Sequence, residues 1–311
     1  MLYWFLSGPF IYLSLFIFIV FSAIKLRSYI TMPRHLRWDL YPVPHQGADG
    51  SKYQKVDFHK APAKFSLFYE CKEMMGEMIL IKKAFVHNLK LWLGSFPLHI
   101  GLYISGLWLA FLVVGALLEL YGLKVTAQTD NLLPSLVYYA TLFTGPIGFS
   151  LGFLGSFILL GLRYSDNHLR SMSDFVTYVN LYLMISLFGS ATLAWWFVDP
   201  TFELIRHHAI SLITLNPSIV PHPLLAVQLF TFCLFIIYLP FSRMFHVSAK
   251  YFFYHKIMWD DEAMKANSKL ENSVSNYLNY PVDWSASHVA KGKSWLEQVK
   301  NGKDGGQDKH G

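Results

Sequence analysis

The sequence has little charge for its length. Only 15% of its 311 residues are charged, whereas 53% are hydrophobic. A soluble domain carries charge on about a quarter of its residues, so the composition excludes an ordinary soluble protein. Because the hydrophobic residues form long uninterrupted runs, we predict an all-α membrane protein that crosses the bilayer several times.

Cysteine is also scarce. Cys71 and Cys233 lie far apart and belong to no CxxC pair, which excludes an Fe–S cluster or a zinc ribbon held by this chain alone. The CxxCH motif that attaches a c-type haem is absent as well. Any haem would therefore be of b type. We interpret the two thiols as small apolar residues.

No positively charged segment precedes the first apolar run, Leu2–Ile24, and no small-residue cleavage site follows it. Lys25 and Arg27 come immediately behind it. A cleaved signal peptide has the opposite order of charge. We therefore predict that residues 1–24 form an uncleaved first transmembrane helix with its N-terminus outside.

Most of the basic residues fall between or after the apolar runs. With five membrane-spanning helices, 24 of the 26 Lys and Arg residues lie on one side of the membrane, and only Lys124 and Arg206 lie on the other. The positive-inside rule then puts the C-terminus in the cytoplasm and the chain in the cytoplasmic (inner) membrane. This distribution also explains the net charge of +6 without a nucleic-acid partner. The further runs are Leu91–Tyr121, Leu132–Leu162, Phe175–Val198 and Pro223–Phe245.

The rest of the chain divides around these runs. Residues 25–90 are predicted to be a basic, amphipathic cytoplasmic segment, and residues 91–246 a core of four transmembrane helices. Between Phe65 and Lys90 the apolar residues recur at helical spacing, which predicts a helix that lies on the membrane or on a partner. Residues 247–311 form a cytoplasmic tail, and its Gly/Lys/Asp-rich end, Gly302–Gly311, is predicted to be disordered.

Two histidines stand out from the thirteen in the sequence. His99 lies about 12 Å into the second apolar run at ~1.5 Å per residue, and His246 closes the fifth. The second helix begins and the fifth ends on the cytoplasmic side, so both histidines are expected at a similar depth. Ionisable groups inside membrane helices indicate function. Two imidazoles at matched depth predict axial ligation of one haem iron, held between the second and fifth helices.

Cations near this pair are candidates to bind the haem propionates. Arg163 and Arg243 lie at the cytoplasmic boundary, and His168 lies in the turn beside Arg163. A guanidinium pairs well with a carboxylate, although such residues also extend toward lipid headgroups. Small residues leave one side of the second helix without bulk, which suits either a porphyrin or a neighbouring helix. They are Gly94, Gly101, Ser105 and Gly106.

Four stretches resemble a known family, the gamma subunit of respiratory nitrate reductase, which is a five-helix dihaem cytochrome b. The likeness is greater to the gamma-like membrane cytochromes of sulfate reducers, which partner a heterodisulfide-reductase-like Fe–S protein. The stretches are RHLRWDLYPVPH (Arg34–His45), FPLHIGLY (Phe96–Tyr103), YLPFSRMFHVSAKYFFYHKIMWDDE (Tyr238–Glu262) and NYPVDWSASH (Asn279–His288).

The resemblance implies specific ligands. In that family each haem takes one histidine from the second helix and one from the fifth, and the haem nearer the cytoplasm matches His99 and His246. The positions of the outer pair hold Leu109 and Gln228, neither of which offers an imidazole. The resemblance therefore implies one haem b. A second haem would need other ligands, for which the candidates are His207, His208 and His222.

The function implied by the resemblance is electron transfer within a quinone-linked oxidoreductase complex. Electrons would pass between the menaquinone pool and a cytoplasmic Fe–S subunit of heterodisulfide-reductase type. Some relatives also imply a periplasmic multihaem cytochrome c and other membrane subunits.

The alternative is a redox-inactive membrane anchor that docks a cytoplasmic oxidoreductase. The loss of imidazoles at Leu109 and Gln228 favours an anchor, and the presence of both His99 and His246 argues against it. A third class, a small-solute transporter, would show broken or repeated helices with buried charges near the middle of the membrane. The sequence does not have these features.

Overall fold

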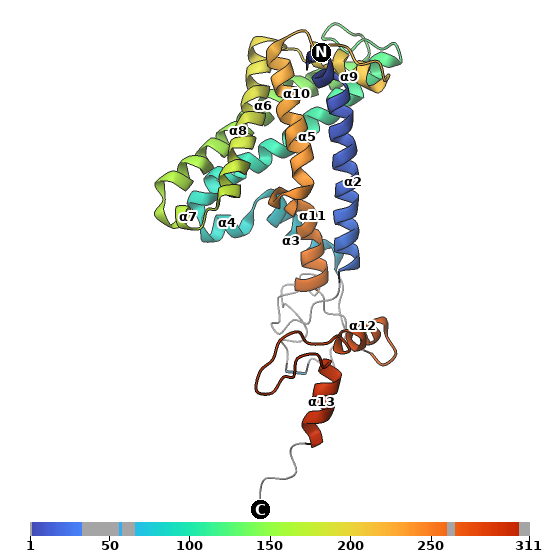
Figure 1. Cartoon of the computed structure of the whole chain (residues 1–311). Coiled ribbons are helices and arrows are strands. Elements are labelled where there is room, and N and C mark those ends of the chain that lie inside the picture. Colours follow the sequence, from blue (N-terminus) through green and yellow to red (C-terminus); the bar gives the residue numbers. More distant parts are fainter. Residues whose placement is uncertain (1, 33–55, 58–65, 260–264, 305–311) are drawn as a thin grey trace, which may run out of the picture. The chain divides into compact units, whose positions relative to one another are not determined.

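The computed structural model describes residues 2–32, 56–57, 66–259 and 265–304 (Figure 1). The chain divides into two compact units. The spanning unit comprises Met1–Arg27 and Glu70–Ser248, and the tail unit comprises Ser28–Tyr69 and Ala249–Gly311. The stretch Arg34–His45, which contributes to the family resemblance, lies outside the described residues.

Five helices are long and apolar enough to cross a membrane, which confirms the prediction of a multi-pass, all-helical protein for the described part of the chain. The spans correspond to the five apolar runs of the sequence, with ends that differ by up to about seven residues. They are α2 (Pro9–Thr31), α5 (Leu89–Leu120), α6 (Leu132–Ser165), α8 (Phe175–Phe197) and α10 (Pro223–Tyr238), which a short 3-10 turn extends to Phe241.

The spanning helices pack in sequence order. α5 packs along α6, α6 against α8, and α8 against α10 (Figure 1). A short helix, α9 (Glu203–Ile213), covers the C-terminal end of α5, and α1 (Leu2–Ser7) lies beside α10. Among the described residues, α5 and α10 are not one of the helix pairs whose backbones pack extensively.

Glycines determine how closely α5 and α6 approach. A Cβ atom added at Gly101 would overlap the backbone of Gly152, and one added at Gly155 would overlap the backbone of Leu98. Small residues let membrane helices pack backbone against backbone, where van der Waals contact takes the place of the hydrophobic effect. The α5–α6 pair is therefore a rigid base for the side chains on the other faces of α5.

Proline and glycine break two of the predicted helices. The first run is divided at Gly8 into α1 and α2, and α2 begins with Pro9, a residue favoured at the first position of a helix. The fifth run does not continue as one α-helix to Phe245 as predicted. Pro240 has no N–H to donate and its ring hinders the preceding turn. The chain therefore forms 3-10 turns at Leu239–Phe241 and Arg243–Phe245 before α11 (His246–Phe253) and a π-helical turn (Tyr254–Met258).

The amphipathic helix predicted between Phe65 and Lys90 is two helices, α3 (Leu67–Ile79) and α4 (Lys82–His87). Ile81 separates them with a left-handed backbone, φ 51°. Asn88 then caps α5, because its side chain accepts a 3.0 Å hydrogen bond from the Leu91 N–H. The chain thus turns from α4 directly into the second membrane-spanning helix.

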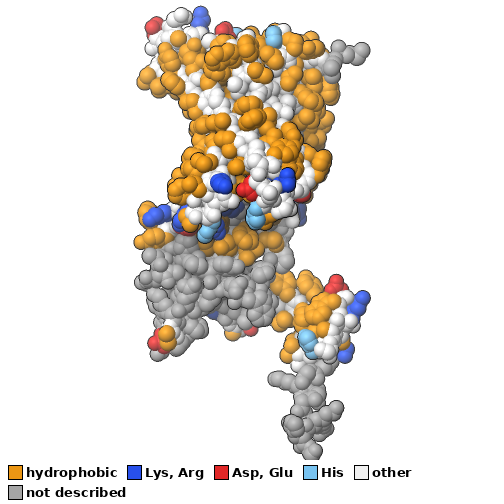
Figure 2. Space-filling model, turned by 90° about the vertical axis from the view of Figure 1, so that its left-hand side faces the viewer, with side chains coloured by type: hydrophobic (Ala, Val, Ile, Leu, Met, Phe, Trp, Pro, Cys, Tyr) orange, Lys and Arg blue, Asp and Glu red, His pale blue; other side chains and the backbone are white. Residues whose placement is uncertain are grey.

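The two ends of the spanning unit differ in charge. One end, here called the basic end, carries Lys25, Lys90, Arg163 and Arg243 together with α3, α4 and α7 (Asn167–Ser171). The other, the α9 end, carries α1 and α9 (Figure 1). Figure 2 shows hydrophobic side chains over the face of the spanning helices between these ends, with charged side chains gathered at each boundary. This is the surface expected of a protein embedded in lipid.

The tail unit has its own short helices, α12 (Lys269–Leu278) and α13 (Trp295–Asp304). Ser294 and Glu297 form a capping box at the start of α13, with hydrogen bonds of 2.8 and 3.2 Å between their side chains and backbone N–H groups. The helix ends at Asp304, and the disorder predicted for Gly302–Gly311 stays a prediction. Residues 305–311 lie outside the described part.

Candidate functional site

The rings of His99 and His246 lie next to each other at the basic end. Their centroids are 5.9 Å apart and their planes form an angle of 68°. His99 is half-buried on α5, and His246 is exposed at the first residue of α11. The structure therefore brings together, from α5 and α11, the two histidines that the sequence singled out.

Both imidazoles are oriented by backbone carbonyls. Nδ1 of His99 lies 2.7 Å from the Ser95 carbonyl oxygen, and Nδ1 of His246 lies 3.1 Å from the Arg243 carbonyl oxygen. A carbonyl oxygen only accepts, so Nδ1 carries the hydrogen in each ring and donates it. The lone pair of each ring is then on Nε2, which is the arrangement found in metal-ligating histidines.

The separation of the two rings is close to that of two imidazoles that ligate one iron. With metal–nitrogen bonds of about 2 Å, two imidazoles on opposite faces of one iron have ring centres about 6 Å apart. The observed separation is 5.9 Å. Among the described residues there is no group of three or more His, Cys, Asp or Glu side chains that could hold a metal. Two imidazoles suit an iron whose remaining ligands come from a porphyrin.

Lys25 holds the segment that leads into His246. Its Nζ donates a 2.8 Å hydrogen bond to the Pro240 carbonyl and lies 5.6 Å from the centre of the Phe245 ring. The 3-10 turns leave carbonyl groups without partners from the helix, and the ammonium group of α2 satisfies one of them. The position of His246 therefore depends on α2 as well as on α10.

The two predicted propionate-binding arginines already have partners. Arg243 forms an ion pair with Asp174, the residue that caps α8. Arg163 donates to the Ser173 hydroxyl at 3.0 Å and to the Leu169 carbonyl at 3.3 Å. Both arginines lie at the basic end, as expected, but they connect α6, α8 and the segment before His246. His168 is exposed on α7.

Asp174 stays ionised throughout the physiological pH range. Hydrogen bonds from the hydroxyl and N–H of Thr177, followed by the Arg243 guanidinium, lower its pKa to about 2. A carboxyl with a lowered pKa contributes to stability above its unfolded pKa, and the contribution is lost as the pH falls toward the folded pKa. Both members of the Arg243–Asp174 pair are therefore charged at neutral pH.

Most of the small residues on α5 serve helix packing. Side chains or backbone of α6 would meet a Cβ at Gly94 and at Gly101, and the Ser105 hydroxyl lies where a Cβ at Gly148 would point. Gly106 is different, because an added Cβ would meet nothing within 4 Å. Of the two alternatives for these residues, helix packing is therefore correct for Gly94, Gly101 and Ser105.

The positions expected for an outer haem lie in different surroundings. Leu109 is 38% exposed on α5, whereas Gln228 is 9% exposed on α10. Beside Gln228, the Thr231 hydroxyl bonds to the Ser190 hydroxyl of α8 at 2.9 Å and to the Gln228 carbonyl at 3.0 Å. Polar side chains of α8 and α10 here bond to each other, as they do between packed membrane helices.

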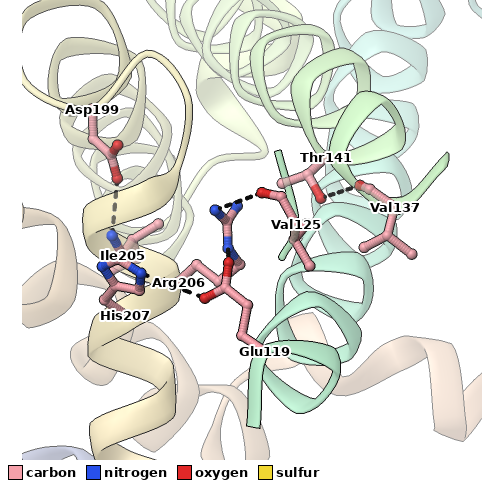
Figure 3. A network of polar contacts seen from close by, with 8 residues as sticks. All are labelled: Glu119, Val125, Val137, Thr141, Asp199, Ile205, Arg206 and His207. Carbon is pink, nitrogen blue, oxygen red and sulfur yellow. Dashed lines mark hydrogen bonds and ion pairs between the residues drawn. The ribbon is translucent and has the colours of Figure 1, made fainter. Parts of the chain in front are cut away.

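A polar network at the α9 end was not anticipated from the sequence. Arg206, which is 3% exposed, donates to the Glu119 carboxylate at 2.8 Å and to the Val125 carbonyl at 3.0 Å (Figure 3). His207 Nε2 lies 3.5 Å from the same carboxylate. The sequence contains a signal for this network. Glu119 lies near the end of the second apolar run, and Arg206 is the single arginine in the connection between the fourth and fifth runs.

Two of the three histidines considered for a second haem, His207 and His222, have other structural roles. His207 belongs to the Glu119 network, and His222 caps α10 by accepting a 3.2 Å hydrogen bond from the Leu224 N–H. His208 is 3% exposed, and its burial lowers the pKa of the imidazole. Asp199 supports the same helix by accepting the Ile205 N–H at 2.9 Å, and burial raises the pKa of its carboxyl.

Comparisons with known proteins add no family to this picture. No model of a protein family matches the chain, and no curated protein matches it. The resemblance to nitrate reductase gamma subunits therefore stays a prediction that depends on the four sequence stretches. The site itself is defined by geometry: two imidazoles of fixed tautomer, 5.9 Å apart at the basic end of the spanning helices.

Proposed function

We propose that this protein is a membrane cytochrome b subunit of a respiratory electron-transfer complex. The observation that carries the proposal is the His99–His246 pair, whose 5.9 Å separation and carbonyl-bound Nδ1 atoms suit two axial ligands of one iron. A bound haem b would supply a one-electron carrier at this point. The chain's own contribution is to fix the orientation of both rings through the backbone carbonyls of Ser95 and Arg243.

The proposed electron route joins the menaquinone pool to a cytoplasmic Fe–S subunit of heterodisulfide-reductase type. In this proposal the basic end faces the cytoplasm, in agreement with the distribution of lysine and arginine in the sequence. α11 begins at His246 and continues into the tail unit, so a partner bound to that unit would have a direct covalent connection to one ligand. A periplasmic multihaem cytochrome c and other membrane subunits complete the complex in this proposal.

A single haem is proposed because the outer positions lack imidazoles. Leu109 and Gln228 cannot ligate haem iron, and the hydrocarbon core is ~30 Å thick. Electrons from the opposite side of the membrane would then need a relay outside this chain. The quinone site is therefore proposed either near the His99–His246 pair or on another membrane subunit.

The test is a dithionite-reduced minus oxidised spectrum of the purified chain, with haem b quantified per polypeptide. We expect close to one haem, and its loss in His99→Ala and in His246→Ala. His255→Ala is a matched control, because Nδ1 of His255 is likewise 2.9 Å from a backbone carbonyl, that of Tyr251, but the residue lies in the tail unit. The control should keep its haem.

The possible outcomes separate the alternatives. Two haems per chain would contradict the argument from Leu109 and Gln228. A correctly folded chain with no haem would contradict the cytochrome and support the redox-inactive anchor. Loss of haem in the His255→Ala control would show that the spectrum reports general unfolding instead of ligation.

A further inference from the structure

Trp92, His99 and Tyr103 share one face of α5. They are seven and four residues apart, which places the three side chains within about 40° of one another around the helix axis. The His99 and Tyr103 rings are 6.5 Å apart in an edge-on arrangement. The histidine is thus bracketed along its own helix by two aromatic residues that carry polar hydrogens.

Both bracketing residues donate to backbone carbonyls at the end of α3 or directly after it. The Tyr103 hydroxyl bonds to the Met78 carbonyl at 2.8 Å, and the Trp92 indole N–H bonds to the Leu80 carbonyl at 2.8 Å. The last carbonyls of a helix have no partner within it and carry partial negative charge. Side chains of α5 therefore provide the C-terminal cap of α3, from both sides of His99.

The turn after α3 needs this support. Ile81 has a φ of 51°, a left-handed conformation that is strained for a β-branched residue. Phe85 of α4 packs against Trp92 with ring centres 5.0 Å apart, and Trp92 stacks on Phe96 at 4.7 Å. Strained residues persist where the surroundings over-determine them. The Trp92 hydrogen bond and this aromatic column hold the turn against the start of α5.

We propose that Trp92 and Tyr103 are positioning residues that hold the C-terminal end of α3 across the His99 face of α5. This inference rests on the proposed function, because it assigns the end of α3 a role at the His99–His246 site. The partial negative charge at the end of α3 would favour the oxidised state of an iron held at that site. α3 also crosses from the tail unit into the spanning unit at Glu70, which connects this end to the unit proposed to bind the Fe–S partner.

The test uses the full-length chain in lipid nanodiscs with two conservative substitutions. Tyr103→Phe removes the hydroxyl, and Trp92→Phe removes the indole N–H while keeping an aromatic ring between Phe85 and Phe96. Amide hydrogen exchange over residues 70–80 should become faster by several-fold, up to about tenfold, in each variant. The haem midpoint potential should rise in Tyr103→Phe, and rise further in the double variant, while the haem content stays unchanged.

Tyr164→Phe on α6 is the matched control, because it removes a tyrosine hydroxyl whose 2.9 Å hydrogen bond is to the Tyr182 hydroxyl of α8 and not to α3. It should change neither the exchange of residues 70–80 nor the potential. Unchanged exchange and potential in the double variant, with haem bound, would overturn the proposal. A wild-type chain that binds no haem would instead contradict the proposed function, so the two failures are distinguishable.

Discussion

Arg206 is a charged residue removed almost completely from water at the α9 end. It is 3% exposed, and its partner Glu119 is 15% exposed. Removing two charges from water costs about as much as their attraction returns, so a buried pair contributes little net stability compared with an apolar pair of similar size. Breaking such a pair is different, because one charge then stays buried without compensation.

We therefore expect Glu119→Leu to lower the free energy of unfolding by about 3 kcal/mol. The same change combined with Arg206→Met should cost clearly less, because no charge remains unpaired. Denaturant unfolding in detergent micelles, applied to both single variants and the double variant, measures the coupling. Additive single effects would mean that the Val125 carbonyl alone satisfies the guanidinium, and would contradict the prediction.

At the scale of helices, the α5–α6 contact depends on glycine at Gly101. Gly101→Ala would place a methyl group on the backbone of Gly152, so the two helices must separate. Overpacking of this kind costs about 1–3 kcal/mol. Gly161→Ala on α6 is the control, because an added Cβ there meets nothing within 4 Å. It should leave stability unchanged or raise it by up to about 1 kcal/mol, since alanine is the better helix former.

Thermal unfolding of the two variants in the same lipid measures the difference. The prediction fails if Gly101→Ala is as stable as the wild type. It also fails if Gly161→Ala is destabilised by an equal amount. In either case the close approach of α5 to α6 would not be the source of stability at this position.

The membrane-spanning helices could be predicted from the sequence because each is an apolar run long enough to cross a bilayer. The break at Pro240 follows from proline chemistry, but the direction of the chain beyond it does not. α9 was missed because Arg206, His207 and His208 make this short segment read as a polar connection. The break at Ile81 depends on hydrogen bonds from Trp92, which a local pattern does not reveal.

The His99–His246 pair was predictable for a reason that applies to helix ends generally. Successive helices alternate in direction, and the positions of the lysines and arginines show which helix ends share one side of the membrane. Together these features predict that the two histidines lie at the same depth. The partners of the neighbouring arginines were not predictable. Arg243 pairs with Asp174 because α8 begins beside the segment that precedes His246, and this arrangement comes from the packing of α8 against α10.

At the scale of the whole molecule, orientation decides what the proposed site can do. All but two of the lysines and arginines belong to the segments on one side of the five spans, and those two, Lys124 and Arg206, lie on the other. Positive residues stay on the cytoplasmic side during insertion. If the basic end is cytoplasmic, the His99–His246 pair is next to a cytoplasmic partner. If it is not, the proposed route to a cytoplasmic Fe–S subunit is impossible.

The native cysteines allow this orientation to be measured. Cys71 is exposed on α3 at the basic end, whereas Cys233 is fully buried on α10. In intact cells a membrane-impermeant maleimide should not label Cys71, and permeabilisation should make it reactive. Cys233 should stay unlabelled under both conditions, because its burial excludes the reagent.

An added cysteine at the other end completes the experiment. Gln128 is exposed in the connection between α5 and α6, so Gln128→Cys should be labelled in intact cells before permeabilisation. The opposite pattern, with Cys71 reactive and Gln128→Cys protected, would invert the protein. The two imidazoles would then lie at the outer face, where a quinol or a periplasmic cytochrome could reach them, and the cytoplasmic partner would have to be abandoned.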